Sequence, residues 1–189
     1  MPRLPEYAKA ILAVLLEAGE LAVAIGVSGT SSRRLAKLLH RPLATRQSHY
    51  RLRKQILFLR DENLVRSTVA NSLIHLTLTN RGKHLAHKNR LHTLKLPRAS
   101  RWDHKWRIIA FDIPESKRSG RDALRENIKR LGAVQIQKSL WVWPYNCREE
   151  IDFIAGLFGV QSYVHHILAE SITAEKSLRK VFNLSQHIF

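Results

Sequence analysis

The chain has 189 residues, of which 44% are hydrophobic and 25% charged, so one or two ordinary globular domains are expected. Its 32 Lys and Arg residues outnumber 15 Asp and Glu residues, and the resulting net charge of +17 makes a polyanion such as nucleic acid the expected partner. The single Cys147 excludes an internal disulfide framework and a cysteine-rich zinc site, and it fits a reducing cytoplasm, where we expect the protein to act.

The positive charge is concentrated in the first half of the chain. Residues 1–100 contain 18 basic and 5 acidic residues, whereas residues 101–189 contain 14 and 10. Between Glu20 and Asp61 there is no acidic residue, and nine basic residues occur from Arg33 to Arg60. We therefore expect the surface that meets a polyanion to lie in the first half.

The first predicted element is a long helix over Tyr7–Ile25. The apolar stretch within it carries Glu17 and Glu20 and is short for a bilayer span, so we interpret it as a buried helix and expect no membrane association. A short helix over Arg33–Leu39 is predicted next, and it ends before Pro42 because proline disfavours helical geometry in the residue before it.

A third helix is predicted from Thr45 to about Glu62, with the apolar side chains of Leu52, Ile56 and Leu59 at positions i, i+4 and i+7 on one face. Two strands around a turn follow, over 64–69 and 73–78, and then a helix from Thr79 or Asn80 towards Leu91. Three helices followed by a hairpin is the order of a winged helix-turn-helix domain, in which the third helix usually enters the major groove.

The third helix and the helix before it carry the residues that we predict to contact DNA. Arginine can pair with guanine edges and glutamine with adenine, while lysine mostly meets phosphates. A solvated basic face is the alternative interpretation, and the long stretch without acidic residues favours DNA. The predicted contacts from the third helix are Arg46, Gln47, Tyr50, Arg51 and Lys54, and Arg33, Arg34 and Lys37 are predicted to hold the DNA backbone.

The second half of the chain has a different pattern. A linker with Pro97 precedes an alternation of strands and helices in the order βαββαβ, which is that of the ferredoxin-like fold. The predicted elements are strand 105–113, helix 116–131, strands 134–137 and 139–143, helix 147–158, strand 162–169 and a final helix 175–184. The expected fold class is therefore α+β, with a winged helix-turn-helix domain over 1–95, a linker over 96–101 and a ferredoxin-like dimerisation domain over 102–189.

One segment of the second half carries a family resemblance. The strand that ends in Asp112-Ile-Pro-Glu115, the helix with spaced arginines, Leu131-Gly132 and the strand over 137–144 follow one another in a specific order. This arrangement resembles the Cas-two-like central domain of PaaX-type transcriptional repressors over roughly residues 102–170. The preceding region, with Leu78-Thr-Asn-Arg-Gly82 after the hairpin, is similar to the winged-helix domain of the same family.

The resemblance implies a homodimeric transcriptional regulator, a repressor, that binds specific double-stranded DNA and needs no cofactor. Two-fold symmetry would present paired recognition helices to a palindromic site, with half-sites one helical turn or a multiple apart. A second possibility is an architectural binder with little preference between sequences.

Asp112 raises an alternative of another class. By resemblance to Cas-two nucleases, this aspartate would meet its symmetry mate across a dimer and bind Mg²⁺, which could activate water against a phosphodiester. The chain would then be an endonuclease or a CRISPR spacer-acquisition subunit, with an integrase partner and an appended DNA-binding domain. Asp112 could equally end a strand and bond local backbone N–H groups.

Three further groups of side chains have more than one interpretation. Arg118, Arg121 and Arg125 share a helix face and could contact nucleic acid, form dimer salt bridges or remain solvated near Asp122 and Glu126. The four tryptophans indicate a core or a dimer interface rather than a ligand site. His84 and His87 could share a metal, but no neighbouring carboxylate or cysteine completes the set, so we interpret them as exposed polar residues.

Overall fold

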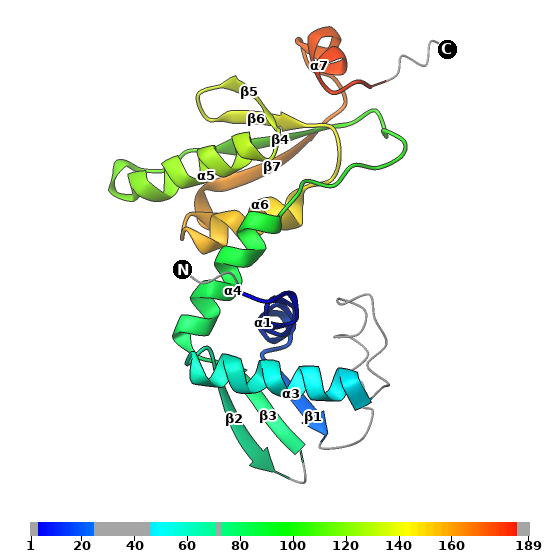
Figure 1. Ribbon diagram of the computed structural model, residues 1–189. Helices are drawn as coiled ribbons and strands as arrows, with labels where there is room; N and C mark the ends of the chain where they lie inside the picture. Colours follow the sequence, from blue (N-terminus) through cyan, green and yellow to red (C-terminus); the bar gives the residue numbers. More distant parts are fainter. Residues whose placement is uncertain (1–3, 25–45, 71–72, 185–189) are drawn as a thin grey trace. The chain divides into compact units, whose positions relative to one another are not determined.

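The computed structural model describes residues 4–24, 46–70 and 73–184 (Figure 1). The chain divides into two compact units, residues 1–93 and 94–189. In the described residues, no helix is both long enough and apolar enough to cross a membrane. The predicted helix over 33–39 and the predicted hairpin turn at 71–72 lie outside the described residues.

The first unit combines three described helices with a three-stranded antiparallel sheet. The sheet has the order β1-β3-β2, so the last strand in the sequence lies in the middle. The elements are α1 (Glu6–Ala18), β1 (Glu20–Ala24), α3 (Arg46–Asp61), β2 (Val65–Ala70), β3 (Leu73–Leu78) and α4 (Asn80–Thr93).

The prediction of one helix over Tyr7–Ile25 was wrong in its second half. The helix ends at Ala18, and Gly19 follows it with φ of 74°, a left-handed conformation that glycine adopts without steric cost. The next five residues form β1, which pairs with β3 from Glu20 opposite Thr77 to Ala24 opposite Leu73. Pairing with a strand about fifty residues away overrides the local apolar pattern, which suits a buried helix or a buried strand equally.

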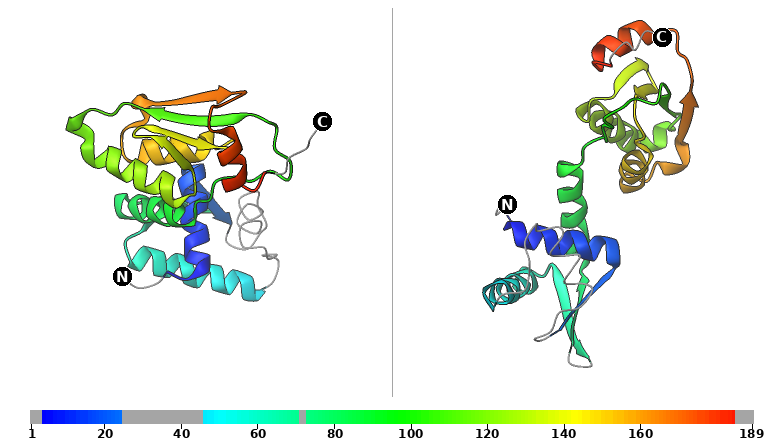
Figure 2. Two further views of the ribbon diagram at one scale, coloured as in Figure 1. Left: turned by 90° about the horizontal axis from the view of Figure 1, so that it is seen from above. Right: turned by 90° about the vertical axis from the view of Figure 1, so that its right-hand side faces the viewer.

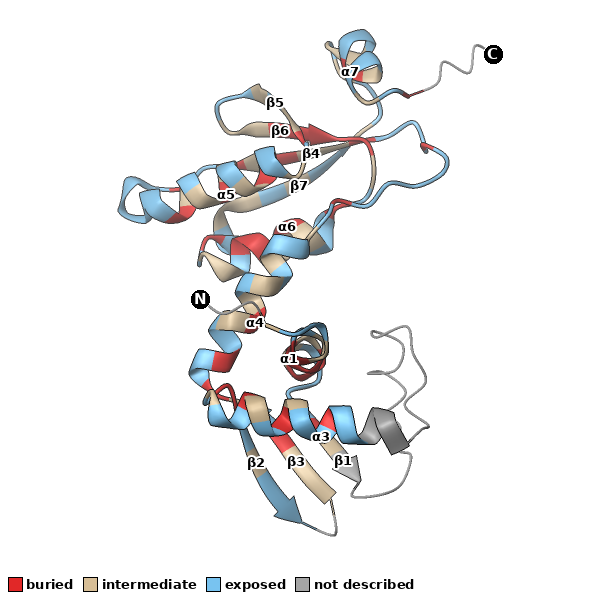
Figure 3. Cartoon of the chain, in the orientation of Figure 1, coloured by how far each residue is buried: buried red, intermediate tan, exposed pale blue. Residues whose placement is uncertain are grey.

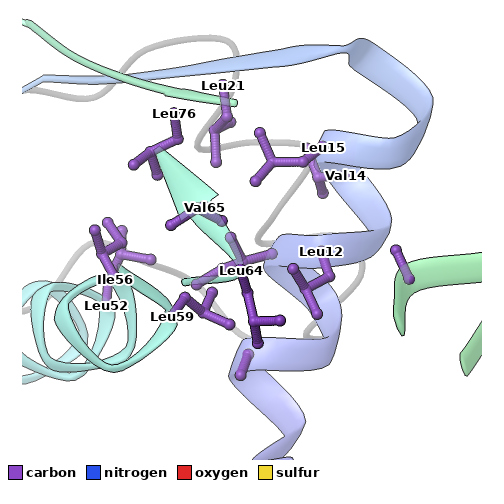
Figure 4. Packing of buried hydrophobic residues seen from close by; sticks show 13 residues of the cluster. Leu12, Val14, Leu15, Leu21, Leu52, Ile56, Leu59, Leu64, Val65 and Leu76 are labelled. Carbon is purple, nitrogen blue, oxygen red and sulfur yellow. The ribbon is translucent and has the colours of Figure 1, made fainter. Parts of the chain in front are cut away.

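The core of the first unit lies between α1, α3 and the sheet (Figure 4). From α1 it takes residues such as Leu12 and Leu15, and from the sheet Leu21 and Leu76. The predicted apolar face of α3 is confirmed, because its three apolar side chains are only 0–7% exposed and pack in this core. They are Leu52, Ile56 and Leu59.

The second unit has the predicted ferredoxin-like order. Its antiparallel sheet has the strand order β5-β6-β4-β7, as expected when two βαβ halves of a βαββαβ chain interleave. The α+β fold class with a ferredoxin-like second domain is thereby confirmed. The elements are β4 (Trp106–Phe111), α5 (Arg118–Arg130), β5 (Val134–Gln137), β6 (Leu140–Trp143), α6 (Arg148–Leu157), β7 (Val164–Ala169) and α7 (Glu175–Val181), with short 3₁₀ turns at Glu115–Lys117 and Gln161–Tyr163.

Helices α5 and α6 lie together against one face of this sheet (Figure 2). They bury Leu124 and Ile128 from α5 and Ile151 and Ile154 from α6. A separate cluster joins Trp102, Trp106 and Val142 to Leu178 of α7. All four tryptophans of the chain are buried, in agreement with their interpretation as core residues.

The residues predicted as a linker belong to the second unit. Leu96 is buried, and the indole Nε1 of Trp143 donates a hydrogen bond of 3.1 Å to the carbonyl oxygen of Pro97. The guanidinium of Arg98 lies 5.6 Å from the centroid of the Trp143 ring. The segment is therefore attached to the sheet of the second unit by both a polar and a cation–π contact.

Candidate nucleic-acid interface

Helix α3 has one buried and one exposed face (Figure 3). Opposite its buried apolar side chains, Tyr50 is 67% exposed, and Arg51, Arg53 and Lys54 are exposed as well. An exposed tyrosine beside three cations is a surface that can meet both phosphates and base edges.

The cations on this face are not neutralised by the described part of the chain. Arg51, Arg53 and Lys54 form no ion pair with another described residue, and the acidic residue of α3 itself is Asp61 in its last turn, 3.7 Å from Arg60. Cations without intramolecular partners can exchange their counterions for phosphates, and the release of those ions favours binding. The charge on this face is therefore available to an external anion.

The other predicted DNA contacts lie outside what the structure describes in atomic detail. Arg46 and Gln47 belong to the first turn of α3, but their side chains are outside the described set. Arg33, Arg34 and Lys37 fall in the range 25–45, which the structure does not describe. All five remain predictions.

Sequence reasoning did not assign two exposed cations of the first unit to the interface. Arg53 lies three residues after Tyr50, a spacing that places both on one side of a helix, and Arg66 is exposed on β2. The helical spacing could have identified Arg53 from the sequence. Arg66 could not be assigned in this way, because the face that a strand residue occupies depends on its register with β3.

The arginines of α5 have acidic partners within the second unit. Arg121 is only 19% exposed, lies 2.8 Å from Glu115 and donates to the Ile113 carbonyl at 3.2 Å. Arg118 lies 3.5 Å from Glu115 and 3.6 Å from Asp122, and Arg125 lies 3.7 Å from Asp122. The contacts with Glu115 and Ile113 tie α5 to the turn that follows β4, whereas the pairs with Asp122 lie within the helix. They leave the three arginines less free to bind a phosphate than the cations of α3.

The same contacts lower the pKa of a carboxylate in the turn. The hydrogen bond and the charge of Arg121 hold the pKa of Glu115 below its usual value, so the carboxylate stays ionised beside the arginines. In the same way, the hydrogen bond from Arg107 lowers the pKa of Asp103 at the start of the second unit.

Asp112 is exposed directly after β4, and its backbone N–H donates to the carbonyl of Tyr163 at 3.3 Å. Within residues 4–24, 46–70 and 73–184, no group of three His, Cys, Asp or Glu side chains could hold a metal ion. The residues around the turn include Arg125, whose guanidinium lies 5.7 Å from the ring centroid of Phe111. Asp112 alone supplies one of the several oxygen ligands that Mg²⁺ prefers, and the nuclease alternative takes the second carboxylate from a partner copy, so that alternative stays a prediction.

Two other polar groups of the second unit have structural roles. His166 Nε2 lies 2.8 Å from an oxygen of Asp152, which joins β7 to α6. Cys147 is 1% exposed, and burial raises the pKa of its thiol to about 12, so it remains protonated and unreactive at neutral pH.

The second unit is thus a ferredoxin-like domain whose first strand ends in an Asp-Ile-Pro-Glu turn held by arginines. Residues 99–181 match the family model of the PaaX protein central Cas2-like domain. The second unit therefore contains a PaaX-type central Cas2-like domain, as the sequence resemblance predicted. The match covers the second unit, and the winged-helix interpretation of the first unit stays a prediction. No curated protein matches the chain.

Proposed function

We propose that the protein is a transcriptional regulator that binds specific double-stranded DNA with α3 in the major groove. The observation that carries this proposal is the exposed face of α3, where Tyr50, Arg51 and Lys54 stand opposite a buried apolar face and have no acidic partner among the described residues. The match of residues 99–181 to the PaaX central Cas2-like domain supports the regulatory role.

The arrangement of the first unit supports a winged helix. Helix α3 directly precedes the β2–β3 hairpin, and β1 completes a small sheet with the order β1-β3-β2. A helix with its side chains is about 10–12 Å across, and the major groove is about 12 Å wide, so the exposed face of α3 fits the groove. The hairpin would then lie over the adjacent backbone.

The chemistry of the side chains suggests a division of labour. Arg51 and Arg46 can each donate two hydrogen bonds to a guanine, and Gln47 can pair with an adenine. Lys54 and Arg53 are suited to phosphates, as are Arg33, Arg34 and Lys37 from the preceding segment. The phosphate contacts would set the position of α3, and the base contacts would select the sequence.

A homodimer is supported by the sheet of the second unit. The ring of Phe111 lies against Arg125 of α5, so Ile108 and Ala110 of β4 lie on the opposite face of the sheet from α5. Ile108 packs there against the cluster that includes Trp106 and Leu178 of α7. Ile108 lies opposite Ile167 of β7, which is 47% exposed. Pairing of two copies through the exposed part of this face would cover Ile167 and would repeat α3 about a two-fold axis, as a palindromic DNA site requires.

The test is a fluorescence anisotropy titration against the DNA upstream of the protein's own gene and against a scrambled duplex, at fixed salt with Mg²⁺ present. We expect tighter binding to the upstream duplex by about a thousandfold, because specific sites typically exceed non-specific ones by at least that factor. A gel checks that the DNA stays intact. Equal affinity for both duplexes would favour an architectural binder, and shortened products would favour the nuclease.

A further inference from the structure

A pocket of about 100 Å³ opens on the first unit between the start of α1, the end of α3 and one face of α4. Its apolar walls are Leu4, Phe58, Leu64 and Leu85. Leu4, Phe58 and Leu85 pack against the core of the unit but stay partly exposed, because the pocket keeps one side of each uncovered. The rest of its lining is polar and consists of Glu62, Arg81, His84 and Lys88.

The charged side chains at the pocket favour an anion. Arg81, His84 and Lys88 lie at i, i+3 and i+7 on one face of α4, and α4 contains no acidic residue. Glu62 supplies the negative charge in the lining, and it is already 3.6 Å from Arg81. Lys88 is exposed and forms no ion pair with another described residue. An anion in the pocket would therefore meet at least one cation that is not compensated.

The walls of the pocket are held in place before any ligand arrives. The hydroxyl of Thr79 donates to the carbonyl of Asn63 at 2.7 Å, and the Thr79 N–H donates to the carbonyl of Leu64 at 3.1 Å. Gly82 lies so close to Leu64 that an added Cβ would be 1.9 Å from its carbonyl oxygen. The first turn of α4 is thus fixed against the Leu64 wall, and small-molecule sites are usually preformed in this way.

The size of the pocket limits the ligand. An apolar cavity of roughly 150 Å³ holds a benzene molecule, so a pocket of about 100 Å³ encloses a body of roughly four carbon atoms, and its open side leaves room for a ring of six that is partly outside. The anionic group would remain at the mouth, near Lys88 and His84. A short aliphatic or aromatic carboxylate has both features.

We propose that this pocket binds a compact apolar carboxylate, and that the bound ligand regulates the DNA affinity of α3. Phe58 and Glu62 of the lining belong to, or directly follow, the last turn of α3, so a ligand would contact the helix that carries Arg51 and Lys54. The regulatory half of this inference rests on the proposed function. The ligand site itself does not depend on it.

The first experiment measures binding without DNA, by ligand-observed NMR on the full chain. Pentanoate and benzoate are the probes, and acetate, pentanamide and benzamide are the controls. We expect Kd values on the order of 1 mM or below for the two probes, and at least tenfold weaker binding of acetate, which lacks the apolar body, and of the amides, which lack the charge. Equal binding of acids and amides, or no binding of either probe, would overturn the site.

Two variants locate the ligand. Lys88→Gln is expected to weaken benzoate binding about tenfold because it removes the uncompensated cation, whereas Lys83→Gln, on the same helix but outside the pocket lining, is the matched control and should change nothing. Leu85→Phe, checked for folding by circular dichroism, is expected to fill the pocket and to abolish binding of both probes. Unchanged affinity in Lys88→Gln and Leu85→Phe would place the ligand elsewhere and overturn the proposal.

The second experiment adds 10 mM benzoate to the DNA titration. We expect at least a threefold change in affinity for the upstream duplex in the native protein and none in Leu85→Phe. If benzoate binds at the pocket but leaves the DNA affinity unchanged, the regulatory half is overturned. If the protein shows no specific DNA binding, the proposed function fails, whereas the NMR result still decides the ligand site.

Discussion

Helices α3 and α5 carry similar numbers of basic side chains but use them differently. On α3, Arg51, Arg53 and Lys54 are exposed and have no ion pair with a described residue. On α5, Arg121 and Arg125 are 19% and 24% exposed and reach Glu115 and Asp122. A count of arginines therefore says little about phosphate binding, because what matters is whether acidic side chains nearby already hold the charge.

The largest expected effect is on α3. The double variant Arg51→Ala, Lys54→Ala should weaken binding to the upstream duplex by roughly 30- to 100-fold, since each base contact typically contributes 1–3 kcal/mol and each phosphate contact adds to the salt dependence. Anisotropy at four salt concentrations measures both, and the slope of log K against log salt should become shallower. Unchanged affinity and slope would show that the free cations of α3 do not meet DNA.

Gly82→Ala should damage the first unit and spare the second. The new Cβ would collide with the Leu64 carbonyl, and such overpacking costs about 1–3 kcal/mol of unfolding free energy. Tryptophan fluorescence reports on the second unit because all four tryptophans lie there, while far-UV circular dichroism reports on both units. We expect the unfolding midpoint measured by circular dichroism to move to a lower denaturant concentration. The midpoint measured by tryptophan fluorescence should not change.

The control for this variant is Gly156→Ala in α6. The nearest heavy atom to its added Cβ is Gln161 Oε1 at 3.5 Å, an ordinary contact, and alanine favours a helix over glycine. This change should leave both unfolding midpoints unchanged, or should move the fluorescence midpoint to a slightly higher denaturant concentration. A loss of second-unit stability would contradict the packing described for α6.

The paired charges of the second unit should give a modest dependence on pH. Because the folded-state pKa of Glu115 lies below its ordinary value of 4.5, its contribution to stability is present above that value and is lost as pH falls through the folded pKa. Melting curves followed by tryptophan fluorescence from pH 6 to about 3 should therefore show a falling Tm. In Glu115→Gln, Tm should fall less over this pH range than in the native protein. If Tm depends on pH identically in both proteins, the ion pair between Glu115 and Arg121 does not stabilise the fold.

The smallest effects are expected at α5 and Asp112. Arg118→Ala should change DNA affinity less than about twofold, because Arg118 already lies near Glu115 and Asp122. Asp112→Ala should also change DNA affinity less than about twofold. Like the native protein, it should leave DNA intact in the presence of Mg²⁺. Cleavage by the native protein that Asp112→Ala abolishes would instead establish the nuclease alternative.

Local pattern in the sequence was enough for much of this architecture. The spacing of Leu52, Ile56 and Leu59 predicted the buried face of α3, and the order of strands and helices after residue 102 predicted the ferredoxin-like unit, because both depend on short-range periodicity. The imbalance of charge between the two halves is likewise a property of the sequence alone.

Tertiary structure decided what depends on distant partners. Residues 20–24 are apolar enough for a helix, and their pairing with β3 makes them a strand. The arginines of α5 form a periodic stripe in the sequence, but only the fold brings Glu115 and Arg121 to 2.8 Å. The pocket beside α4 joins residues from Leu4 to Lys88, which no local pattern could relate. Periodicity acts within a few residues, whereas strand pairing, ion pairing and cavities depend on segments that meet only when the chain folds.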